Sequence, residues 1–343
     1  MRSTLAVPAM PLALLRMTDG LIVHQALCAA ATLGIADLLN DAEGSAAELA
    51  SILRVNEDAL YRVLRFLSGQ GVFRETGGAR TFVNSPLSQY MRSDVPNSVR
   101  AVLIFRGGGY YFSPFTEFLY SVETGVPARD KVLGNGAFEY LRADPEAERV
   151  FDEAMTAISE LSAPAIAATY DFGRWDTVTD VGGGTGALLA AMLRAHPGLQ
   201  GTLADAPSVV ERARRREFLS GELAVRTRFE ACDFFRAIAS GSRAYVMKNI
   251  IHAWNDTEAT AILRNCRRAL PDDGALVLIE YCLGDDNAPS LGKTIDLVMM
   301  TITGGKERTI EEHRALLASA GFQLNRAIPV SPDITIIEAL PSR

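Results

Sequence analysis

The 343-residue sequence predicts an α/β protein in two parts, a mostly helical N-terminal domain of winged-helix type and a C-terminal domain with a Rossmann-like parallel sheet. Residues 1–170 show helical spacing of apolar positions almost throughout. After Asp176, short β-rich runs alternate with helical stretches, and a glycine-rich loop joins the first run to the first helix. These observations divide the chain into a domain over 1–100, a helical segment over 101–170 and a sheet domain over 171–343.

Composition narrows the class of protein. Apolar residues make up 48% and charged residues 22%, a globular balance that excludes extended disorder. The formal net charge of −7 argues against a nucleic-acid partner. Four scattered cysteines form no CxxC pair and no Cys/His cluster, so we expect a reducing compartment and no metal; they are Cys28, Cys232, Cys266 and Cys282.

No stretch near the N-terminus shows the ~20 consecutive apolar residues of a membrane span. The segment 21–39 is interrupted by His24, Gln25 and Asp37. The short apolar run before it lacks a sustained core and a convincing cleavage site for a signal peptide. We therefore expect no membrane partner and a cytoplasmic location.

The first domain is predicted as helix, turn, helix and β-hairpin. One amphipathic helix is expected over 21–39, and Ser45 with Glu48 forms a capping box for a short helix to residue 53. Asn56 caps the next helix, and a two-stranded ribbon follows over 72–83. This order is typical of a winged helix.

A winged helix can bind DNA or act as a dimerisation module. Glu57 and Asp58 begin the second helix, where base-contacting residues of DNA-binding proteins usually lie, so the dimerisation module is favoured. The helices expected over 8–18 and 21–39 carry more apolar surface than a small domain buries alone. The sequence thus predicts a homodimer.

Between the domains, a triple glycine over 107–109 is expected to form a loop, and Pro164 should kink a long helix over 146–170. In the second domain, strands are expected over 177–181, 201–205, 226–232, 244–247 and 275–281, closed by a hairpin of 323–330 and 333–340. Helices are expected over 187–195, 207–219, 257–270 and 309–320.

The loop Asp180–Gly186 carries the strongest chemical signal. Its glycines allow a tight turn and a close approach to a ligand, although the loop alone also fits a dinucleotide. Asp180 beside the loop would repel a pyrophosphate but suits a cation. Asp205 ends the next strand, 23 residues after Gly182, where a carboxylate can hold ribose hydroxyls. A ribose and a positive group without phosphate fit S-adenosylmethionine, with Asp180, Gly182, Gly184 and Asp205 as binding residues.

His252 is the candidate base. It follows the carboxyl end of a predicted strand, where open α/β sheets bind ligands, and its ordinary pKa of ~6.5 suits proton transfer. An imidazole works best as a base when a carboxylate holds its second nitrogen. Glu280 at a strand end and Glu307 in the segment 304–309 are the two candidate carboxylates.

A set of motifs occurs in the order seen in caffeate-type O-methyltransferases: Asp180–Gly186, Asp205–Pro207, Asp233-Phe234, Met247-Lys248, His252–Asp256 and Gly304–Thr309. The chain resembles these S-adenosylmethionine-dependent enzymes over nearly its whole length, especially the bacterial members that tailor polycyclic aromatic natural products. The resemblance implies the class I methyltransferase fold, a winged-helix dimerisation domain and cytoplasmic secondary metabolism.

The resemblance also implies roles by position. Asp233 would accept a hydrogen bond from the adenine amine, Phe234 would cover the ring, and Lys248 and Ser159 would lie near the cofactor. His252 would be the general base, flanked by Glu280 and Glu307. Phe151, Met155 and Met299 would face a small aromatic substrate, so the segment 101–170 would contribute to the substrate pocket.

Two departures from the family stand out. The segment 296–304 is one residue shorter than in plant phenylpropanoid enzymes, and Thr301-Ile302-Thr303 replaces a polar His-Asn pair, which favours a bulkier, less polar ring system. The arginine cluster over 212–216 departs as well and is expected to be a solvated helix face.

The leading hypothesis is therefore methylation of a phenolic hydroxyl. N-methylation, or cofactor-assisted hydroxylation or decarboxylation on the same scaffold, is the alternative. A winged-helix regulator that senses a small molecule is a third. His252 favours O-methylation, because an amine nucleophile has less use for an imidazole base.

Overall fold

The computed structural model describes residues 9–40, 42–77, 80–134 and 136–342. The chain divides into two compact units, Met1–Phe112 and Ser113–Arg343. The boundaries predicted from the sequence, at residues 100 and 170, stay a prediction.

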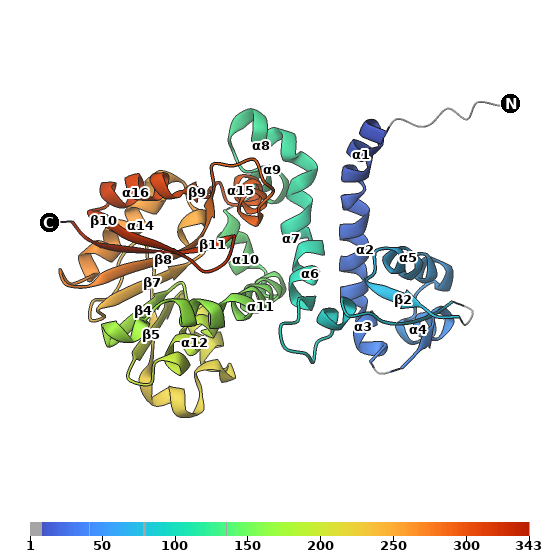
Figure 1. Ribbon diagram of the computed structural model, residues 1–343, viewed down its shortest axis with the longest axis horizontal. Coiled ribbons are helices and arrows are strands. Elements are labelled where there is room, and N and C mark those ends of the chain that lie inside the picture. Colours follow the sequence, from blue (N-terminus) through green and yellow to red (C-terminus); the bar gives the residue numbers. More distant parts are fainter. Residues whose placement is uncertain (1–8, 41, 78–79, 135, 343) are drawn as a thin grey trace. The chain divides into compact units, whose positions relative to one another are not determined.

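The first unit is mostly helical (Figure 1). Its helices are α1 (Ala9–Thr18), α2 (Gly20–Leu33), α3 (Ile35–Leu38), α4 (Ala46–Leu53), α5 (Glu57–Gly69), α6 (Arg100–Gly107) and α7 (Gly109–Phe112), with a 3₁₀ turn over Ser88–Met91. A small antiparallel sheet has the order β1 (Gly44–Ser45), β3 (Thr81–Asn84) and β2 (Phe73–Glu75). Helices α4 and α5 followed by the β2–β3 hairpin match the predicted order of a winged helix; residues 78 and 79 of its predicted turn lie outside the described residues.

Local sequence signals set the ends of these helices. Ser45 forms the expected capping box with Glu48, and Asn56 accepts a hydrogen bond from the Ala59 amide. The single helix predicted over 21–39 is wrong, because Gly34 adopts a left-handed conformation (φ 67°) and ends α2 before α3 begins. The predicted loop at 107–109 reduces to one residue, Gly108, between α6 and α7.

A long apolar surface runs along α1 and α2. The stretch Met10–Leu33 has 24 residues and a window of mean hydropathy 1.2, of which 11% is buried, so by length and composition it would be able to cross a membrane. The sequence-based expectation missed this stretch because it required an uninterrupted apolar run. A helix of this kind is weak evidence for a span, since core helices and signal sequences pass the same test.

The second unit begins with four helices, α8 (Phe118–Thr124), α9 (Ala128–Leu133), α10 (Ala137–Ala143) and α11 (Pro145–Thr169). Helix α11 starts at Asp144, whose carboxylate accepts hydrogen bonds from the amides of Glu146 and Ala147, with Pro145 in the first turn. The helix continues unbroken through Pro164.

The sheet of this unit has the order β10-β11-β8-β7-β4-β5-β6. Its parallel strands are β4 (Thr177–Val181), β5 (Gln200–Asp205), β6 (Thr227–Ala231), β7 (Ala244–Lys248) and β8 (Ala275–Leu283). The antiparallel pair β10 (Phe322–Pro329) and β11 (Ile334–Pro341) completes one edge as predicted, and short β9 (Arg308–Thr309) pairs with the end of β8.

Helices α12 (Ala187–Ala195) and α13 (Pro207–Arg214) follow β4 and β5, and α14 (Asp256–Ala269), α15 (Leu291–Ile302) and α16 (Ile310–Ser319) occur later in the chain. The helix predicted over 207–219 is shorter than expected, since α13 ends at Arg214 and a separate 3₁₀ turn covers Glu217–Leu219. Further 3₁₀ turns cover Ser113–Glu117, Phe172–Trp175, Gly221–Arg226 and Ile251–Ala253.

Alternating residues of the central strands feed two hydrophobic layers. Val277 and Ile279 of β8 pack in one cluster with α12, and Leu276 and Leu278 pack in the other with α14 and α16. Figure 1 shows α12 and the pair α14 and α16 on opposite faces of the sheet. Burial on both faces explains the continuous apolar runs of these strands, and it fixes the carboxyl edge of the sheet as a rigid support.

Candidate active site

Four residues singled out by sequence lie toward the carboxyl ends of neighbouring strands. Strand order β5-β4-β7-β8 places Asp205, Asp180, Lys248 and Glu280 in that sequence along one edge. The first strand, β4, lies between β5 and β7, so the chain order reverses direction here. Open α/β sheets bind ligands at such a switch point.

The glycine loop after β4 needs its glycines. Gly182, Gly184 and Gly186 have φ of +70°, +57° and +93°, a region that side-chain-bearing residues rarely adopt. A Cβ on Gly182 would also lie 2.4 Å from Ile250 Cδ1. The Gly184 amide donates to Asp205 Oδ2 at 2.8 Å, so the end of β5 holds the loop in place.

Asp205 uses both carboxylate oxygens locally, because Oδ1 also accepts from the Ala206 amide at 2.7 Å. Each oxygen keeps a further lone pair, which leaves the carboxylate able to accept from ligand hydroxyls. Burial raises the pKa of Asp205 to about 6, although the two backbone hydrogen bonds favour its charged form.

Asp180 is buried, and its Oδ2 has no hydrogen-bond partner within the described residues. Burial and then the charge of Asp205 raise the pKa of Asp180 to about 7, while Lys248 acts in the opposite direction. Burial lowers the pKa of Lys248 to about 8, against the charges of Asp180 and Glu280. A buried carboxylate with a free oxygen beside a glycine loop fits the cationic methionyl part of S-adenosylmethionine.

Lys248 also reaches across to the long helix, where its Nζ donates to Ser159 Oγ at 3.2 Å. The two residues come from β7 and α11, so the structure brings together a pair that the sequence predicted as neighbours of the cofactor. Asp233 and Phe234 lie in the loop after β6, at the same edge of the sheet. The Asp233 carboxylate is exposed and accepts from the Phe235 amide at 3.0 Å.

The loop that carries Phe234 is held from behind. Asn265 Nδ2 on α14 donates to the Phe234 carbonyl at 2.7 Å, and the rings of Phe234 and Phe235 lie 6.1 and 4.7 Å from the Trp254 ring. Sequence reasoning missed Asn265, because a buried polar residue in a helix gives no motif signal.

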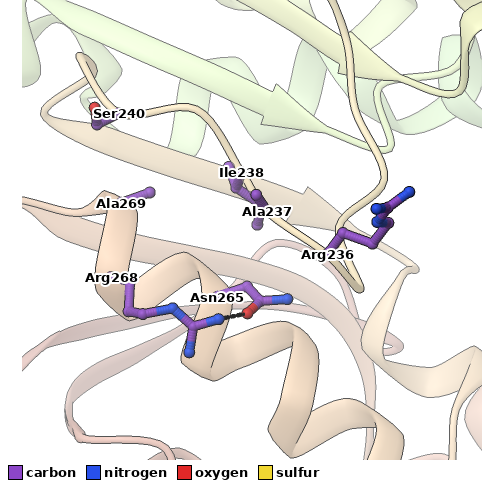
Figure 2. Close-up of a pocket in the computed structure, with 7 residues that line it drawn as sticks. All are labelled: Arg236, Ala237, Ile238, Ser240, Asn265, Arg268 and Ala269. Carbon is purple, nitrogen blue, oxygen red and sulfur yellow. Dashed lines mark hydrogen bonds between the residues drawn. The ribbon is translucent and has the colours of Figure 1, made fainter.

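A cavity behind this loop is lined by Arg236, Ala237, Ile238, Ser240, Asn265, Arg268 and Ala269 (Figure 2). Arg268 donates to Asn265 Oδ1, as the dashed line in Figure 2 shows. None of the residues predicted for the active site lines this cavity, so it is separate from the chemistry described here.

His252 lies in the 3₁₀ turn Ile251–Ala253 that follows β7. Its Nδ1 is 2.6 Å from Glu307 Oε1 and 4.0 Å from Glu280 Oε2. Glu280 Oε1 accepts from the Ile251 amide at 3.0 Å, which places this carboxylate beneath the turn. The acids predicted to flank the base therefore do lie beside it, and all three side chains are buried.

Because the Glu307 carboxylate 2.6 Å away can only accept, the hydrogen of the neutral imidazole is assigned to Nδ1, and the lone pair then lies on Nε2. Burial by itself would lower the pKa of His252, but the hydrogen bond to Glu307 and the charges of both glutamates outweigh it and raise the pKa above 6.5. Burial raises the pKa of Glu280 to about 7, and Glu307 adds to this effect while His252 opposes it.

Three ligand atoms of His252, Glu280 and Glu307 lie within 4.8 Å of one another, which is also the size of a metal site. Tetrahedral ligands at ~2.0 Å from an ion are about 3.3 Å apart. The 2.6 Å separation of Nδ1 and Glu307 Oε1 is that of a short hydrogen bond, so the geometry favours a shared hydrogen over an ion. The expectation of no metal stays a prediction.

Arg308 joins the segment that carries His252 to the segment that carries Glu307. Its guanidinium donates to the carbonyls of Ile251 (3.3 Å) and Trp254 (3.0 Å), on either side of His252, and to the Asp256 carboxylate (2.8 Å). Arg308 is 1% exposed. Because Glu307 precedes Arg308 in the chain, these hydrogen bonds also fix the distance between His252 and Glu307.

Helix α15 positions Glu307 from the other side, since Asp296 Oδ1 accepts the Glu307 amide at 2.9 Å. Met299, on the same helix, is half-buried. Phe151 and Met155 lie one turn apart on α11 and are half-buried as well. The Phe138 ring of α10 lies beside Phe151, although no sequence motif indicated it. Its centroid is 6.4 Å from that of the Phe151 ring and 5.3 Å from that of the Trp254 ring.

The backbone of Gly305 lies very close to the backbone of the turn that carries His252. A Cβ there would lie 2.0 Å from the His252 carbonyl oxygen and 2.5 Å from the Ala253 carbonyl carbon. Both neighbours are backbone atoms, so neither can move without displacing the His252 turn.

We predict that Gly305→Ala lowers kcat by at least tenfold, because the new methyl displaces the His252 turn, and lowers stability by about 1–3 kcal/mol or more. Calorimetry and steady-state kinetics give both values. Gly284→Ala is the matched control, since nothing lies within 4 Å of a Cβ at that position. Wild-type activity and stability in Gly305→Ala would show that the two segments do not approach as described.

The chain matches the O-methyltransferase domain family over residues 118–323 and the O-methyltransferase dimerisation domain over 15–94. It is 39% identical to the phenazine O-methyltransferase PhzM of Lysobacter antibioticus over 97% of both chains. It is 31% identical to an 8-amino-8-demethylriboflavin N,N-dimethyltransferase of Streptomyces davaonensis, over 91% of this chain and 90% of the other.

Among solved structures, it is similar to an O-methyltransferase of neocarzinostatin biosynthesis in complex with S-adenosylmethionine and 2-hydroxy-5-methyl naphthoic acid. That similarity has a TM-score of 0.81 at 34% identity and covers 93% of this chain and 96% of the other. With the Rossmann-like sheet, the glycine loop and the helical N-terminal unit described above, these matches show that the chain belongs to the S-adenosylmethionine-dependent O-methyltransferase family.

Proposed function

We propose that this chain methylates a phenolic hydroxyl of an aromatic, polycyclic secondary metabolite, with His252 as general base. The observation that carries the proposal is the 2.6 Å contact between His252 Nδ1 and Glu307 Oε1 at the carboxyl edge that also holds Asp180 and Asp205. It gives an imidazole with a held tautomer and a free Nε2 beside the cofactor residues.

S-adenosylmethionine supplies an electrophilic methyl group on a sulfonium. On the protein side, Asp180, Asp205 and the loop with Gly182 and Gly184 would bind its methionyl and ribose parts. Asp233, Phe234, Lys248 and Ser159 would surround the adenine and the adjacent ribose. These groups hold the cofactor in line with the acceptor, which lowers the entropic part of the barrier.

His252 Nε2 takes the phenolic proton as the oxygen becomes methylated. The resulting imidazolium lies against Glu307, with Glu280 as a second nearby carboxylate, so its positive charge is stabilised where it forms. Glu280 and Glu307 act by orienting the imidazole and do not themselves contact the reacting atoms.

Phe151, Met155 and Met299 are the proposed acceptor contacts. Phe138, whose ring packs edge-on against Phe151, is a further aromatic side chain beside them. Aromatic rings and flexible thioethers bind a flat ring system well. The naphthoic acid in the neocarzinostatin enzyme supports a fused-ring acceptor. An amine acceptor is the second candidate, because a relative at 31% identity is an N,N-dimethyltransferase.

We predict that His252→Ala lowers kcat by ~10²–10⁴ on a weakly acidic phenol, the usual effect of losing a positioned base. Cofactor affinity, measured by calorimetry, should change little because Nε2 faces the acceptor. The loss should shrink for a more acidic phenol that is already ionised at the assay pH. Near-full activity of His252→Ala on the weakly acidic phenol would contradict the assignment of His252 as general base. If the variant kept the wild-type rate on an amine acceptor only, N-methylation would be favoured.

The raised pKa of His252 sets the expected pH dependence. The imidazole must be neutral to accept a proton, so kcat/KM should rise with pH through a pKa above 6.5. Glu307→Gln removes a negative charge that raises this pKa, so the rise should move to lower pH and reach a lower plateau. Glu311→Gln, on the exposed face of α16, is the control. An unshifted profile in Glu307→Gln would mean that another group titrates.

We also propose that the chain is a cytoplasmic homodimer that associates through the first unit. The dimerisation family matches residues 15–94, and α1 and α2 expose a row of large apolar side chains: Met10, Leu14, Leu15, Met17, Leu21 and Ile22. A second copy would cover this surface without any need for a lipid bilayer.

Sedimentation equilibrium at micromolar concentration should therefore give twice the chain mass without detergent. Leu14→Glu with Met17→Glu should give the monomer, because two charges would enter the apolar contact. Val225→Glu, at an 87% exposed position in the second unit, should stay dimeric. A wild-type monomer, or a dependence on detergent, would reject the proposed interface.

A further inference from the structure

One face of α11 carries polar side chains at helical spacing. Glu148, Asp152, Thr156 and Ser159 follow one another at intervals of four, four and three residues, so they share a side of the helix. Phe151 and Met155, the proposed acceptor contacts, are adjacent in the sequence to this stripe. Helix α11 thus carries the proposed acceptor contacts next to this row of polar side chains.

Each of these four side chains contacts a residue at the end of a sheet strand or in the segment that follows one. Ser159 accepts from Lys248 at the end of β7, and Thr156 Oγ1 lies 2.7 Å from Thr185 Oγ1 in the glycine loop after β4. Glu148 and Asp152 meet Arg212 of α13, the helix that follows Asp205 and β5. The stripe therefore spans the strand ends where we place the cofactor.

Arg212 contacts the two members of the stripe that lie nearest the start of α11. Its Nη1 lies 2.9 Å from Glu148 Oε2, and its Nε donates to Asp152 Oδ2. Ser208, one turn earlier on α13, donates to Glu148 Oε1 at 3.3 Å. Arg214, Arg215 and Arg216 of the cluster are exposed, as predicted. Arg212 differs, because its side chain is 28% exposed and paired with that of Asp152, which is 12% exposed.

The two halves of α11 are held differently. Ala163 and Ile166 of the second half belong to the main hydrophobic core. In the first half, Ala154 and Ala157 are buried, but none of residues 145–153 is. Polar contacts to Arg212 and Ser208 of α13 therefore add to the attachment of the first turns, beside the ring contact of Phe151 with Phe138, and contacts at a partly exposed surface open more readily than a packed core.

We propose that Arg212 is a positioning residue which, with Glu148 and Asp152, forms a latch that holds the first half of α11 over the bound cofactor and slows its release. The proposal deepens the proposed function, because it rests on the cofactor lying along Asp180 and Asp205. It adds a group that lies outside the motifs that carry the family resemblance. In support, the charges of Arg212 and Asp152 both act on the Asp205 carboxylate.

The test measures cofactor release alone, with no acceptor present. In a stopped-flow displacement experiment with the full-length protein, Arg212→Ala should speed dissociation of S-adenosylmethionine about five- to tenfold, with a much smaller change in the association rate. Asp152→Ala should have a similar effect. The double variant should be no faster than the faster single one, because the pair is already broken.

Three controls separate the latch from a general loss of structure. Arg215→Ala removes an exposed arginine of the same cluster, whose side chain makes no hydrogen bond or ion pair within the described residues, and should release the cofactor at the wild-type rate. Arg212→Lys should restore part of the effect, since it keeps one charge. The exchange Asp152→Arg with Arg212→Asp, made together with Glu148→Gln so that the new aspartate does not face a carboxylate, should release the cofactor more slowly than Arg212→Ala with Glu148→Gln.

If Arg212→Ala melts at the wild-type temperature and releases the cofactor at the wild-type rate, the latch is wrong. Should that variant fail to fold, Glu148→Gln gives the same test at a more peripheral contact, with a smaller acceleration expected and an unchanged rate contradicting the proposal. Equal and additive effects of the two single variants would also overturn it. Since no acceptor is used, failure here leaves the base assignment of His252 untouched, and loss of that assignment leaves this result valid.

Discussion

The hydrogen bond between His252 Nδ1 and Glu307 Oε1 joins residues 55 positions apart in the sequence, and the geometry of the site depends on it. Neither residue lies within a long regular element, since one belongs to a 3₁₀ turn and the other to the loop before β9. Arg308 and the glycine contact at Gly305 hold these two segments in register, and Asp296 fixes Glu307 from α15. A buried polar pair of this kind specifies one arrangement only when its neighbours are also satisfied.

The same region concentrates negative charge away from water. Asp180, Asp205, Glu280 and Glu307 lie near one edge of the sheet, and burial raises the pKa of the first three. Without a bound cation, such carboxylates cost free energy, because each loses hydration that its protein partners only partly replace. A cationic cofactor would stabilise their ionised forms. If Asp180 and Asp205 bind the cofactor as proposed, binding of the positively charged ligand recovers part of this cost.

Much of this site could be predicted because its residues occur in short motifs at strand ends. Glycines with positive φ, an aspartate ending the second strand and a histidine after the fourth are readable from spacing alone. Arg212, Asn265 and Phe138 could not be found this way, since their roles come from contacts between elements distant in sequence. Gly34 was readable in principle, but the apolar period continued across it and hid the left-handed turn.

Nitrogen-15 NMR of the histidine side chains reports directly on the hydrogen bond between His252 and Glu307. In the cofactor-bound protein, neutral His252 should carry its hydrogen on Nδ1, with Nε2 unprotonated, and should titrate with a pKa above 6.5. Glu307→Gln should lower that pKa. A hydrogen on Nε2 in the neutral form, or a pKa below 6.5 that Glu307→Gln leaves unchanged, would contradict the pairing on which the mechanism depends.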